Sequence, residues 1–365
     1  MREFETLSEL SDFLQSDHVQ QIAVQSVDLT QIAARILDIR FTDCLFLGCH
    51  LNEALRDHLG DENFLFPVLN FPFNVYPPKL YNKESLYHGY EPDRPESYEQ
   101  TLDKIVYDHY IKTGKETNAI KETLARRLHD HSITDALQEF ISTYPERKLV
   151  AIMGGHGLSR TSQSYRQLVE ISRELTQRGY LMISGGGPGA MEATHVGAWF
   201  ADKPEADLRI AMDVLAQAPQ YDHPEWLPSA FKVLRDFPEA SYPSLGIPTW
   251  LYGHEPPTPF ATHIAKYFAN SVREEGLLAI AKGGVIYAPG SAGTMQEIFQ
   301  DIAQNHYESF GYASPMVFLN HQYWTQERPV YPVIAHMAQR GDLNHLDLGL
   351  YDTNAEVIDH IEAFG

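Results

Sequence analysis

The sequence predicts an α/β protein: a Rossmann-like, doubly wound parallel sheet over residues 146–365, preceded by an additional α+β domain over residues 1–145. Three observations lead to this fold class. In the second part, apolar runs alternate with helical patterns, as in a parallel sheet covered by helices on both faces. Three of those runs end in glycine-rich turns. The 365 residues also exceed the roughly 250–300 that one hydrophobic core serves, which favours two domains.

The first part of the chain contains short strand-like apolar runs at 21–29, 41–51 and 63–71. A proline-rich stretch follows, which is typical of irregular packed loop rather than helix or central strand. Over 96–144 the pattern is helical, and Pro145 ends it. No internal repeat is visible. The prolines of the stretch are Pro67, Pro72, Pro77, Pro78, Pro92 and Pro95.

In the second part, continuous apolar runs predict buried parallel strands, and the segments between them show apolar residues at helical spacing. The helix over 164–179 has a broad apolar face and ends at a glycine, Gly179. The predicted strands lie at 148–155, 180–187, 244–253, 283–290, 314–320 and 345–351. The predicted helices lie at 164–179, 189–200, 261–281, 294–307 and 333–340, followed by a short C-terminal helix.

Composition and charge narrow the classes of partner. The chain is 43% apolar and 21% charged, an ordinary globular composition. Its formal net charge of −21 argues against duplex DNA or RNA, which needs basic surface to displace counterions. A small anionic ligand remains compatible, because backbone amides bind phosphate on acidic proteins. No run reaches the roughly 18 apolar residues of a membrane span, and the acidic, amphipathic N-terminus is unlike a signal peptide.

The two cysteines, Cys44 and Cys49, lie in one apolar run an odd number of positions apart. On a strand they would point to opposite faces, so we expect two reduced, half-buried thiols rather than a disulfide. Reduced thiols are typical of cytoplasmic proteins, and we expect a cytoplasmic location. Two cysteines without a second pair are too few for a zinc ribbon.

The glycine-rich turns lie at 154–159, 184–192 and 288–297. Ligands of open parallel sheets bind at the carboxyl ends of the strands, so the three turns should converge on one rim. The second and third turns lead straight into helices, whose free N–H groups and dipole favour a phosphate or carboxylate. The alternative is that the glycines only make tight turns. Two such loops in one sheet favour phosphate binding.

Neither of the common nucleotide fingerprints is complete. No loop continues into the Gly-Lys-Ser/Thr of a Walker A motif, and the full Gly-x-Gly-x-x-Gly with an acidic residue after the next strand is absent. Gly185, Gly187 and Ala190 come near it, but their run is more compact. A mononucleotide is therefore favoured over NAD or FAD, and no cofactor is expected.

The runs SGGGPGAMEA at 184–193 and APGSAGTMQE at 288–297 resemble the two signatures of the LOG ("lonely guy") family, GGGxxGLMG and PGGxGTxxE. That family includes cytokinin-activating phosphoribohydrolases and related nucleotide 5′-monophosphate nucleosidases, and some members were long mislabelled lysine decarboxylases. The resemblance covers about residues 147–340. Residues 1–145 do not belong to the compact family pattern, and neither do residues 203–243, which the resemblance makes an insert. It implies a Rossmann-like fold, usually a dimer, and hydrolysis of a nucleoside monophosphate to free base and ribose 5-phosphate.

Matched residue by residue, the resemblance makes Glu297 the catalytic glutamate and places a phosphate in the 288–297 turn. Ser291 stands where the family has glycine, and its hydroxyl either adds a donor for phosphate or is merely tolerated. The residues expected to bind phosphate or nucleotide are Gly154, Gly155, Gly185, Gly186, Gly187, Gly189, Met191, Pro289, Gly290, Ser291, Ala292, Gly293 and Thr294.

The resemblance also implies a catalytic arginine, in an Arg-Lys pair on the helix before the second motif. Here Arg273 is followed by Glu274, one position from the expected register and without a lysine. One position is a rotation of about 100° on a helix. Arg273 is our candidate, and His263 and Lys266 on the same predicted helix are rival cations.

Glu297 also has a purely structural interpretation. Thr294-x-x-Glu297 fits a capping box, in which the glutamate only caps the helix N-terminus. N-glycosidic cleavage passes through an oxocarbenium-like state, and there the same carboxylate would stabilise charge, hold ribose hydroxyls or deprotonate water. With the resemblance, we favour the catalytic interpretation.

Other polar residues are candidates for contacts with the base or ribose. Tyr252, His254 and Glu255 follow a predicted strand and so should lie on the same rim, although a proline-stiffened loop is an equal alternative. Glu192, after the first motif, is a further candidate. Tyr165 has the helical spacing of a core residue.

Neither metal nor pyridoxal-phosphate chemistry is expected. His129-Asp130-His131 and His254-Glu255 lack the spacing of helical metal ligands, which lie three or four positions apart, so we expect solvated surface histidines and no metal. No lysine stands in a context that suggests a Schiff base.

Three functions stay open. The first is a phosphoribohydrolase for a purine, AMP-like nucleoside monophosphate, acting as a homodimer or higher homo-oligomer. The second is a sensor of the same fold that binds a nucleotide without cleaving it, with output through residues 1–145. The third is an assembly protein in which the glycine loops are relics.

Overall fold

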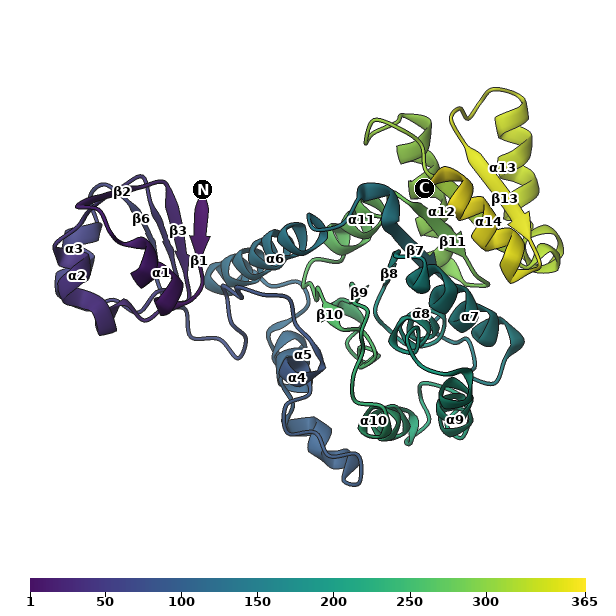
Figure 1. Ribbon diagram of the computed structural model, residues 1–365, viewed down its shortest axis with the longest axis horizontal. Helices are drawn as coiled ribbons and strands as arrows, with labels where there is room; N and C mark the ends of the chain where they lie inside the picture. The colour runs from purple at the N-terminus through teal and green to yellow at the C-terminus, as the bar shows by residue number, and fades with distance from the viewer. The chain divides into compact units, whose positions relative to one another are not determined.

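The structure is a computed structural model that describes residues 1–365, and the chain divides into two compact units (Figure 1). The first unit contains residues 1–80 and 112–139, and the second contains residues 81–111 and 140–365. Residues 81–111 therefore belong with the second unit, which differs from the expected boundary after residue 145.

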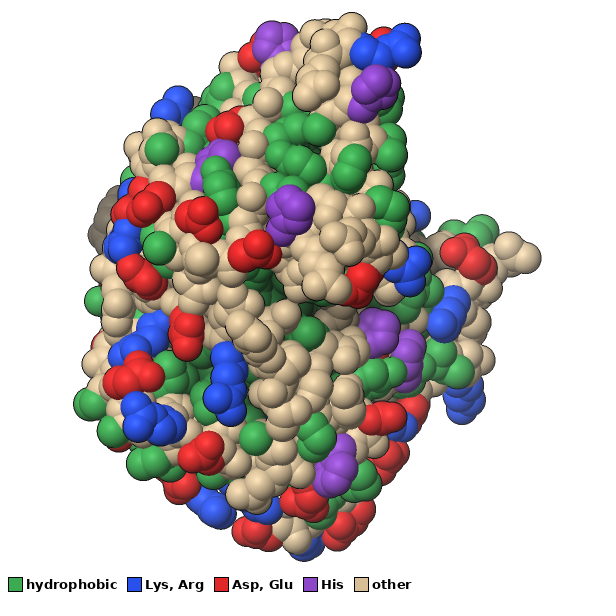
Figure 2. All heavy atoms as spheres, turned by 90° about the vertical axis from the view of Figure 1, so that its right-hand side faces the viewer, with side chains coloured by type: hydrophobic (Ala, Val, Ile, Leu, Met, Phe, Trp, Pro, Cys, Tyr) green, Lys and Arg blue, Asp and Glu red, His purple; other side chains and the backbone are tan.

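No helix has both the length and the apolar character needed to cross a membrane. Figure 2 shows acidic and basic side chains interspersed over one face.

The first unit is a coil of short strand–helix repeats. Four strands form a parallel sheet in the order β1-β3-β5-β6, and β2 pairs with β4. Ala23 pairs with Leu45, and Leu45 pairs with Phe64, so each turn of the coil adds one strand. The strand–helix repeats are alike in backbone structure but share no recurring sequence motif. The elements are β1 (Arg2–Phe4), α1 (Leu7–Phe13), β2 (His18–Gln20), β3 (Ile22–Gln25), η1 (Leu29–Ile32), α2 (Ala33–Leu37), β4 (Arg40–Thr42), β5 (Leu45–Leu47), α3 (Glu53–Leu59), β6 (Phe64–Phe66) and most of α6 (Ile120–Ile141).

Both cysteines are free, as predicted, but for a different reason. The run 41–51 is not one strand: β4 ends at Thr42, and β5 covers only Leu45–Leu47. Cys44 and Cys49 therefore lie outside the strands, and both are buried in the same core rather than half-buried on opposite faces. Burial raises the pKa of the Cys49 thiol to about 11, which keeps it protonated and unreactive at neutral pH.

The second unit contains a seven-stranded, wholly parallel sheet in the order β10-β9-β8-β7-β11-β12-β13. Its strands are β7 (Leu149–Met153), β8 (Leu181–Ser184), β9 (Ser244–Gly246), β10 (His263–Ile264), β11 (Gly284–Tyr287), β12 (Pro315–Leu319) and β13 (Asp347–Tyr351). Its helices are α4 (Lys83–Leu86), α5 (Leu102–Thr113), α7 (Gln163–Gln177), α8 (Ala190–Trp199), α9 (Glu205–Leu215), α10 (Trp226–Asp236), α11 (Asn270–Ile280), α12 (Ala292–His306), α13 (Val330–Gln339) and α14 (Asn354–Phe364), with short helical turns η2 (Pro95–Gln100), η3 (Glu146–Lys148), η4 (Trp250–Tyr252) and η5 (Tyr323–Glu327).

Helices cover both faces of this sheet, which confirms the predicted Rossmann-like α/β architecture. Alternate strand residues show the two faces: Ile286 packs in the core with α7, α8 and α14, whereas the neighbouring Tyr287 donates to Asp301 of α12. The chain runs from β7 to β8 in one direction along the sheet, and from β11 to β12 in the other. The connections therefore diverge between β7 and β11, where ligands of such sheets bind.

Two predicted elements are wrong. The strand expected over 244–253 ends at Gly246, because Pro248 cannot donate to the sheet and η4 follows. The long helix expected over 261–281 begins only at Asn270. Residues before it form β10, held by hydrogen bonds from the Ile264 N–H to the Tyr81 carbonyl and from the Ala265 N–H to the Gly246 carbonyl. Sheet pairing has overridden the local helical pattern.

Candidate active site

A cavity of about 340 Å³ opens in the second unit, where the turns after β7, β8 and β11 meet. This is the predicted rim, beside the divergence point between β7 and β11. All three glycine-rich turns contribute to the wall. The lining residues are Gly154, Gly155, His156, Gly185, Gly187, Met191, Pro248, Thr249, Tyr252, Glu255, Arg273, Glu274, Ser291, Ala292, Gly293, Thr294, Gln296 and Glu297.

The three turns touch through backbone atoms. The Gly155 N–H donates to the Pro289 carbonyl at 3.0 Å, and the Gly155 carbonyl accepts from the Ala190 N–H at 3.1 Å. A Cβ atom on Gly189, which has φ +68°, would lie 2.4 Å from that same carbonyl oxygen. A Cβ atom on Gly154 would lie 2.7 Å from the Ala190 side chain. Glycine at 154 and 189 is therefore needed for the turns to approach one another.

The start of α12 is the more open of the two helix termini at the cavity. Its N-cap, Ser291, makes no side-chain capping bond, and the N–H groups of Ala292, Gly293 and Thr294 have no acceptor. At α8, by contrast, the first N–H already donates to Gly155, and the Glu255 carboxylate lies beside Gly187. An anion is therefore better placed at α12, where three unpaired N–H groups and the helix dipole attract it.

Arg273, on α11, lines the cavity beside Glu297. Its Nε donates to the Ile247 carbonyl at 2.8 Å, which fixes the guanidinium in the wall. Its Nη1 lies 3.8 Å from the nearer Glu297 oxygen and 4.0 Å from Glu274. Thus the structure brings Arg273 and Glu297 together, although the sequence register left that pairing uncertain.

Glu297 does not cap its helix. Because α12 begins at Ala292, Thr294 and Glu297 are the third and sixth helical residues, so the capping-box alternative is excluded. Its side chain is 15% exposed and makes no hydrogen bond. Burial raises the pKa of Glu297 to about 7, Glu274 adds to that rise, and Arg273 opposes it. A carboxyl with a pKa near neutrality and no hydrogen bond suits proton transfer at working pH.

The remaining carboxylates of the wall differ in their attachment. Glu274 accepts from Asn270 Nδ2 at 2.8 Å and from Gln296 Nε2, so it is fixed. The Glu255 carboxylate makes no hydrogen bond, and His156 and His254 each have a ring nitrogen 3.7 Å from one of its oxygens. Glu255 is therefore free to accept a hydrogen bond from a ligand.

Several expected contacts lie outside the cavity wall. Gly186, Gly189, Pro289 and Gly290 shape the turns without lining the cavity. A Cβ atom on Gly290 would lie 2.1 Å from the Thr294 hydroxyl oxygen, which explains glycine there. His254 is more than half exposed and also does not line the cavity. Of the three residues expected from the 250–260 stretch, Tyr252 and Glu255 reach the cavity.

The two rival cations are excluded, because residues 261–269 are not helical. His263 lies on β10 and stacks on Phe140 with ring centroids 4.1 Å apart. Lys266 is fully buried and forms an ion pair with Asp103. Neither lines the cavity.

Glu192 is also misassigned as a ligand contact. It is fully buried and accepts from Arg160 Nε at 2.7 Å and Nη2 at 2.5 Å, and from the Tyr165 hydroxyl at 2.9 Å. Arg160 also donates to Ser229 of α10, so this network ties the insert to α8. Tyr165 is a core residue as predicted, with its hydroxyl in the network.

Five lining residues were missed by sequence reasoning. Thr249 and Pro248 lie in a stretch expected to be strand, Gln296 lies inside the second motif, and Glu274 was noted only as a departure from the family pattern. His156 lies in a turn that was quoted only for its glycines. Position relative to the motifs was the one available signal. The five are His156, Pro248, Thr249, Glu274 and Gln296.

No cluster of three or more His, Cys, Asp or Glu side chains could hold a metal ion. The expectation of solvated histidines fails at His129, which is buried on α6, with its Nδ1 3.0 Å from Asp130 Oδ1. The amphipathic spacing of α6 was too weak to show which face is buried.

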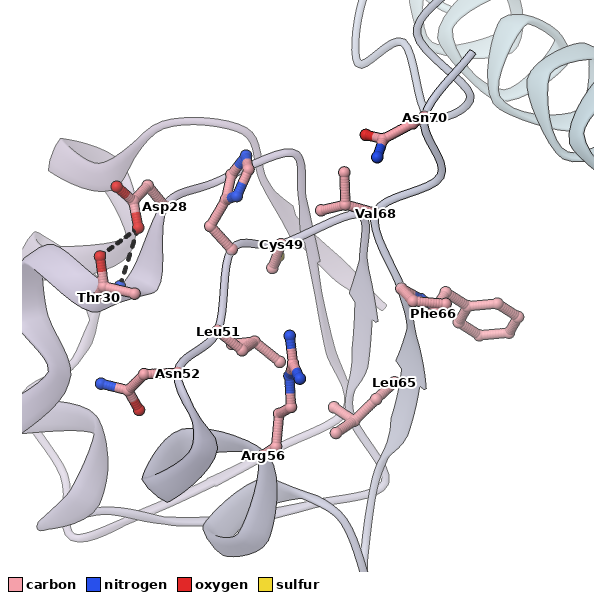
Figure 3. Close-up of a pocket in the computed structure, with 12 residues that line it drawn as sticks. Asp28, Thr30, Cys49, Leu51, Asn52, Arg56, Leu65, Phe66, Val68 and Asn70 are labelled. Atoms are coloured by element: carbon pink, nitrogen blue, oxygen red, sulfur yellow. Dashed lines mark hydrogen bonds between the residues drawn. The ribbon is translucent and has the colours of Figure 1, made fainter.

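A larger hollow of about 920 Å³ lies in the first unit (Figure 3). Two of its polar side chains are engaged: Asp28 accepts from the Thr30 hydroxyl and N–H, and Asn52 accepts from the Leu55 N–H as the cap of α3. Arg56 also lines the hollow, together with apolar side chains such as Leu51 and Leu65. The smaller cavity, unlike this hollow, combines a carboxyl of raised pKa, a nearby guanidinium and an uncapped helix N-terminus.

Comparison with known proteins gives likeness in structure only. Neither a protein-family model nor any curated protein matches the sequence. A molybdenum cofactor binding protein from Rippkaea orientalis aligns with 13% identity and a TM-score of 0.37, over 59% of this chain and 95% of its own. The molybdenum cofactor carrier protein MCP from Chlamydomonas reinhardtii aligns with 12% identity and a TM-score of 0.36, over 59% and 96% of the two chains. Such distant likeness carries no argument about a ligand.

Proposed function

We propose that the chain hydrolyses the N-glycosidic bond of a nucleoside 5′-monophosphate, releasing free base and ribose 5-phosphate. The observation that carries this proposal is Glu297: a partly exposed carboxyl with a pKa of about 7 and no hydrogen bond, in a cavity beside Arg273 and the open start of α12. The two glycine motifs, which resemble those of LOG-type nucleosidases, add support from the sequence.

The phosphate would bind at the start of α12. The N–H groups of Ala292, Gly293 and Thr294 are unpaired, and Ser291 and Thr294 bring hydroxyls to the same wall. Backbone donors at a helix terminus hold an anion without basic surface, which fits a chain of net charge −21. Arg273 supplies the one guanidinium among the residues that line the cavity.

Glu297 would act on the ribose. In the proposed reaction the C1′–N bond breaks, and its electron pair leaves with the base. The oxygen of water bonds to C1′ as a water proton passes to the Glu297 carboxylate. Glu297 then gives that proton to the departed base nitrogen through solvent, which regenerates the carboxylate. The ionised carboxylate also stabilises the oxocarbenium-like charge on the sugar.

The base would occupy the side of Tyr252 and Glu255. Tyr252 offers an aromatic face, and Glu255 is a free acceptor for an exocyclic amino group. This arrangement suits a purine with an amino substituent, the AMP-like ligand that we expected.

Binding without hydrolysis is the alternative, and Glu274 favours it. The related enzymes have a lysine beside the arginine, whereas this chain places a carboxylate 4.0 Å from Arg273. A second negative charge weakens the field available to the phosphate and to the leaving base. The cavity could then hold a nucleotide as a signal.

A base-release assay tests the proposal. Purified protein is incubated with purine, pyrimidine and N6-substituted adenosine monophosphates, and free base is separated by chromatography. Release that Glu297→Gln abolishes, and that Glu275→Gln on the exposed side of α11 preserves, supports hydrolysis. No release, with calorimetric binding of one nucleotide by the same preparation, overturns hydrolysis in favour of the sensor.

A further inference from the structure

The wall that carries Tyr252 and Glu255 is a loop with little regular structure. The Tyr252 loop, residues 247–260, contains four prolines and one short helical turn. Near its ends, the Ile247 N–H donates to the Ser184 carbonyl at 2.9 Å, and the Thr258 N–H donates to the Gly186 carbonyl at 2.8 Å. In between, the Trp250 N–H donates to the Tyr267 carbonyl at 3.0 Å, and the Glu255 N–H donates to the Tyr252 carbonyl within the loop itself. The stretch between Trp250 and Thr258 therefore depends on side chains from outside the loop for its position.

Residues 81–111, which we call the brace, supply that support from behind. No residue of the brace lines the cavity. The Tyr107 ring packs directly on Gly253, so closely that a Cβ atom at 253 would lie 2.4 Å from it. The Tyr87 hydroxyl donates to the Pro257 carbonyl at 2.5 Å. These two contacts bracket Glu255, and Gly253 directly follows Tyr252.

A buried ion pair fixes the brace against the same region. Lys266 and Asp103 are both fully buried and form an ion pair with each other. Asp103 also accepts from the Tyr98 hydroxyl at 2.9 Å, and the Lys266 ammonium lies 5.1 Å from the centroid of the Trp250 ring. A buried pair tolerates little displacement, because a shifted partner leaves a charge uncompensated in the interior. The pair therefore sets the position of α5 relative to the start of the Tyr252 loop.

We propose that the brace determines affinity for the base by holding Tyr252 and Glu255 against the cavity, with Tyr107 and Tyr87 as positioning residues. The proposal rests on the proposed function for the identity of the ligand. The brace lies outside residues 147–340, over which the sequence resembles the LOG family. Recognition of phosphate, at the start of α12, is independent of the brace.

The test compares two ligands that differ only in the base. Calorimetry measures Kd for AMP and for ribose 5-phosphate in the Glu297→Gln background, so that AMP is not consumed. We expect Tyr107→Ala to raise Kd for AMP about tenfold, because the loop must then be ordered on binding, and to leave Kd for ribose 5-phosphate within about twofold. Tyr107→Phe keeps the ring and should change neither. Tyr87→Phe, a milder change that leaves the fold intact, should raise Kd for AMP about threefold.

Tyr331→Ala is the matched control, since it removes a half-buried tyrosine that packs on Phe318 of the same unit but away from the cavity. It should alter neither Kd. The brace proposal is overturned if Tyr107→Ala and Tyr87→Phe weaken both ligands equally, weaken neither, or if the background protein binds ribose 5-phosphate but not AMP. Failure of the proposed hydrolysis gives a different result. The wild-type protein then releases no base, while Tyr107→Ala and Tyr87→Phe still weaken the binding of AMP but not of ribose 5-phosphate.

Discussion

Glu192 and Glu297 occupy similar places in the sequence and contrasting places in the structure. Each follows a glycine-rich turn and lies in the first two turns of the helix that the turn leads into. Glu192 is fully buried, with two hydrogen bonds from Arg160 and one from Tyr165. Glu297 keeps some exposure to the cavity and makes no hydrogen bond, and its nearest cation is 3.8 Å away.

The difference shows that two similar sequence motifs can have different roles in one protein. At α8 the turn is closed: the Gly155 carbonyl occupies the first N–H, and the glutamate holds the insert through Arg160. At α12 the N–H groups are open, and the glutamate has unused acceptors. A carboxylate whose hydrogen-bonding capacity is used within the protein stabilises the fold. A carboxylate with a raised pKa and no hydrogen bond is available for a ligand.

Glu297→Gln should produce the largest effect on turnover. We expect kcat for base release to fall about 10³-fold, the usual contribution of a general acid or base, with Kd for the nucleotide within about threefold. Glutamine matches the shape of the side chain but cannot take a proton. A drop of less than tenfold would show that Glu297 is no more catalytic than Glu192.

The same variant should gain stability at high pH. Burial raises the pKa of Glu297 from 4.5 to about 7, so the folded state binds more protons than the unfolded state between those values. The stability associated with the protonated carboxyl is therefore present below pH 4.5 and lost as pH rises through 7. The Tm of Glu297→Gln minus the Tm of wild type should therefore be larger at pH 8 than at pH 5, as measured by calorimetry.

Glu192→Gln should act on stability rather than catalysis. It leaves the Arg160 charge buried and unpaired, which we expect to cost about 3 kcal/mol of unfolding free energy. Tyr165→Phe, which removes one donor from the same carboxylate, should cost about 1 kcal/mol. Denaturant unfolding measures both. An unchanged stability of Glu192→Gln combined with lost nucleotide binding would reverse the roles assigned to the two glutamates.

The pH dependence of turnover tests the same comparison, since Glu297 lines the cavity and Glu192 does not. Because its ionised form is the active one, kcat/KM should rise about tenfold between pH 6 and pH 8, with a midpoint near the pKa of about 7. Arg273 holds that pKa down, so Arg273→Lys, with a more distant and mobile charge, should move the midpoint to higher pH. A flat profile, or a fall with rising pH, would contradict the role of Glu297 as a base.

Much of the second unit could be predicted from its sequence, because buried parallel strands and amphipathic helices have strong periodic signals. The runs that became β7, β8, β11, β12 and β13 each ended in a turn or loop near the expected residue. The failures lie at the far edge of the sheet. Residues 261–269 have helical spacing, yet β10 forms there because β9 and Tyr81 offer backbone partners. Pairing with a distant segment leaves no local trace in a sequence.

The site was predictable where it depends on glycine and less so where it depends on side-chain partners. Glycines at 154, 189 and 290 are required by close backbone or side-chain approaches, so their motifs mark the turns correctly. The hydrogen bonds of Glu192 come from Arg160, thirty-two positions away in the sequence, and no spacing rule reveals a contact over that separation. The same applies to the brace, whose contacts with the Tyr252 loop join segments about 150 residues apart or more.

The smallest expected effect concerns Ser291, at the open terminus only. Its backbone has φ −107°, which needs no glycine, and its hydroxyl makes no capping bond, so the residue has no visible structural task. If the hydroxyl donates to the phosphate, Ser291→Ala should raise Kd for AMP and for ribose 5-phosphate alike, by about two- to fivefold, with Tm unchanged. Alanine is preferred to glycine in this test, because it removes the hydroxyl without adding backbone freedom. Equal Kd values for wild type and variant, measured by calorimetry, would show that the Ser291 hydroxyl does not hold the phosphate.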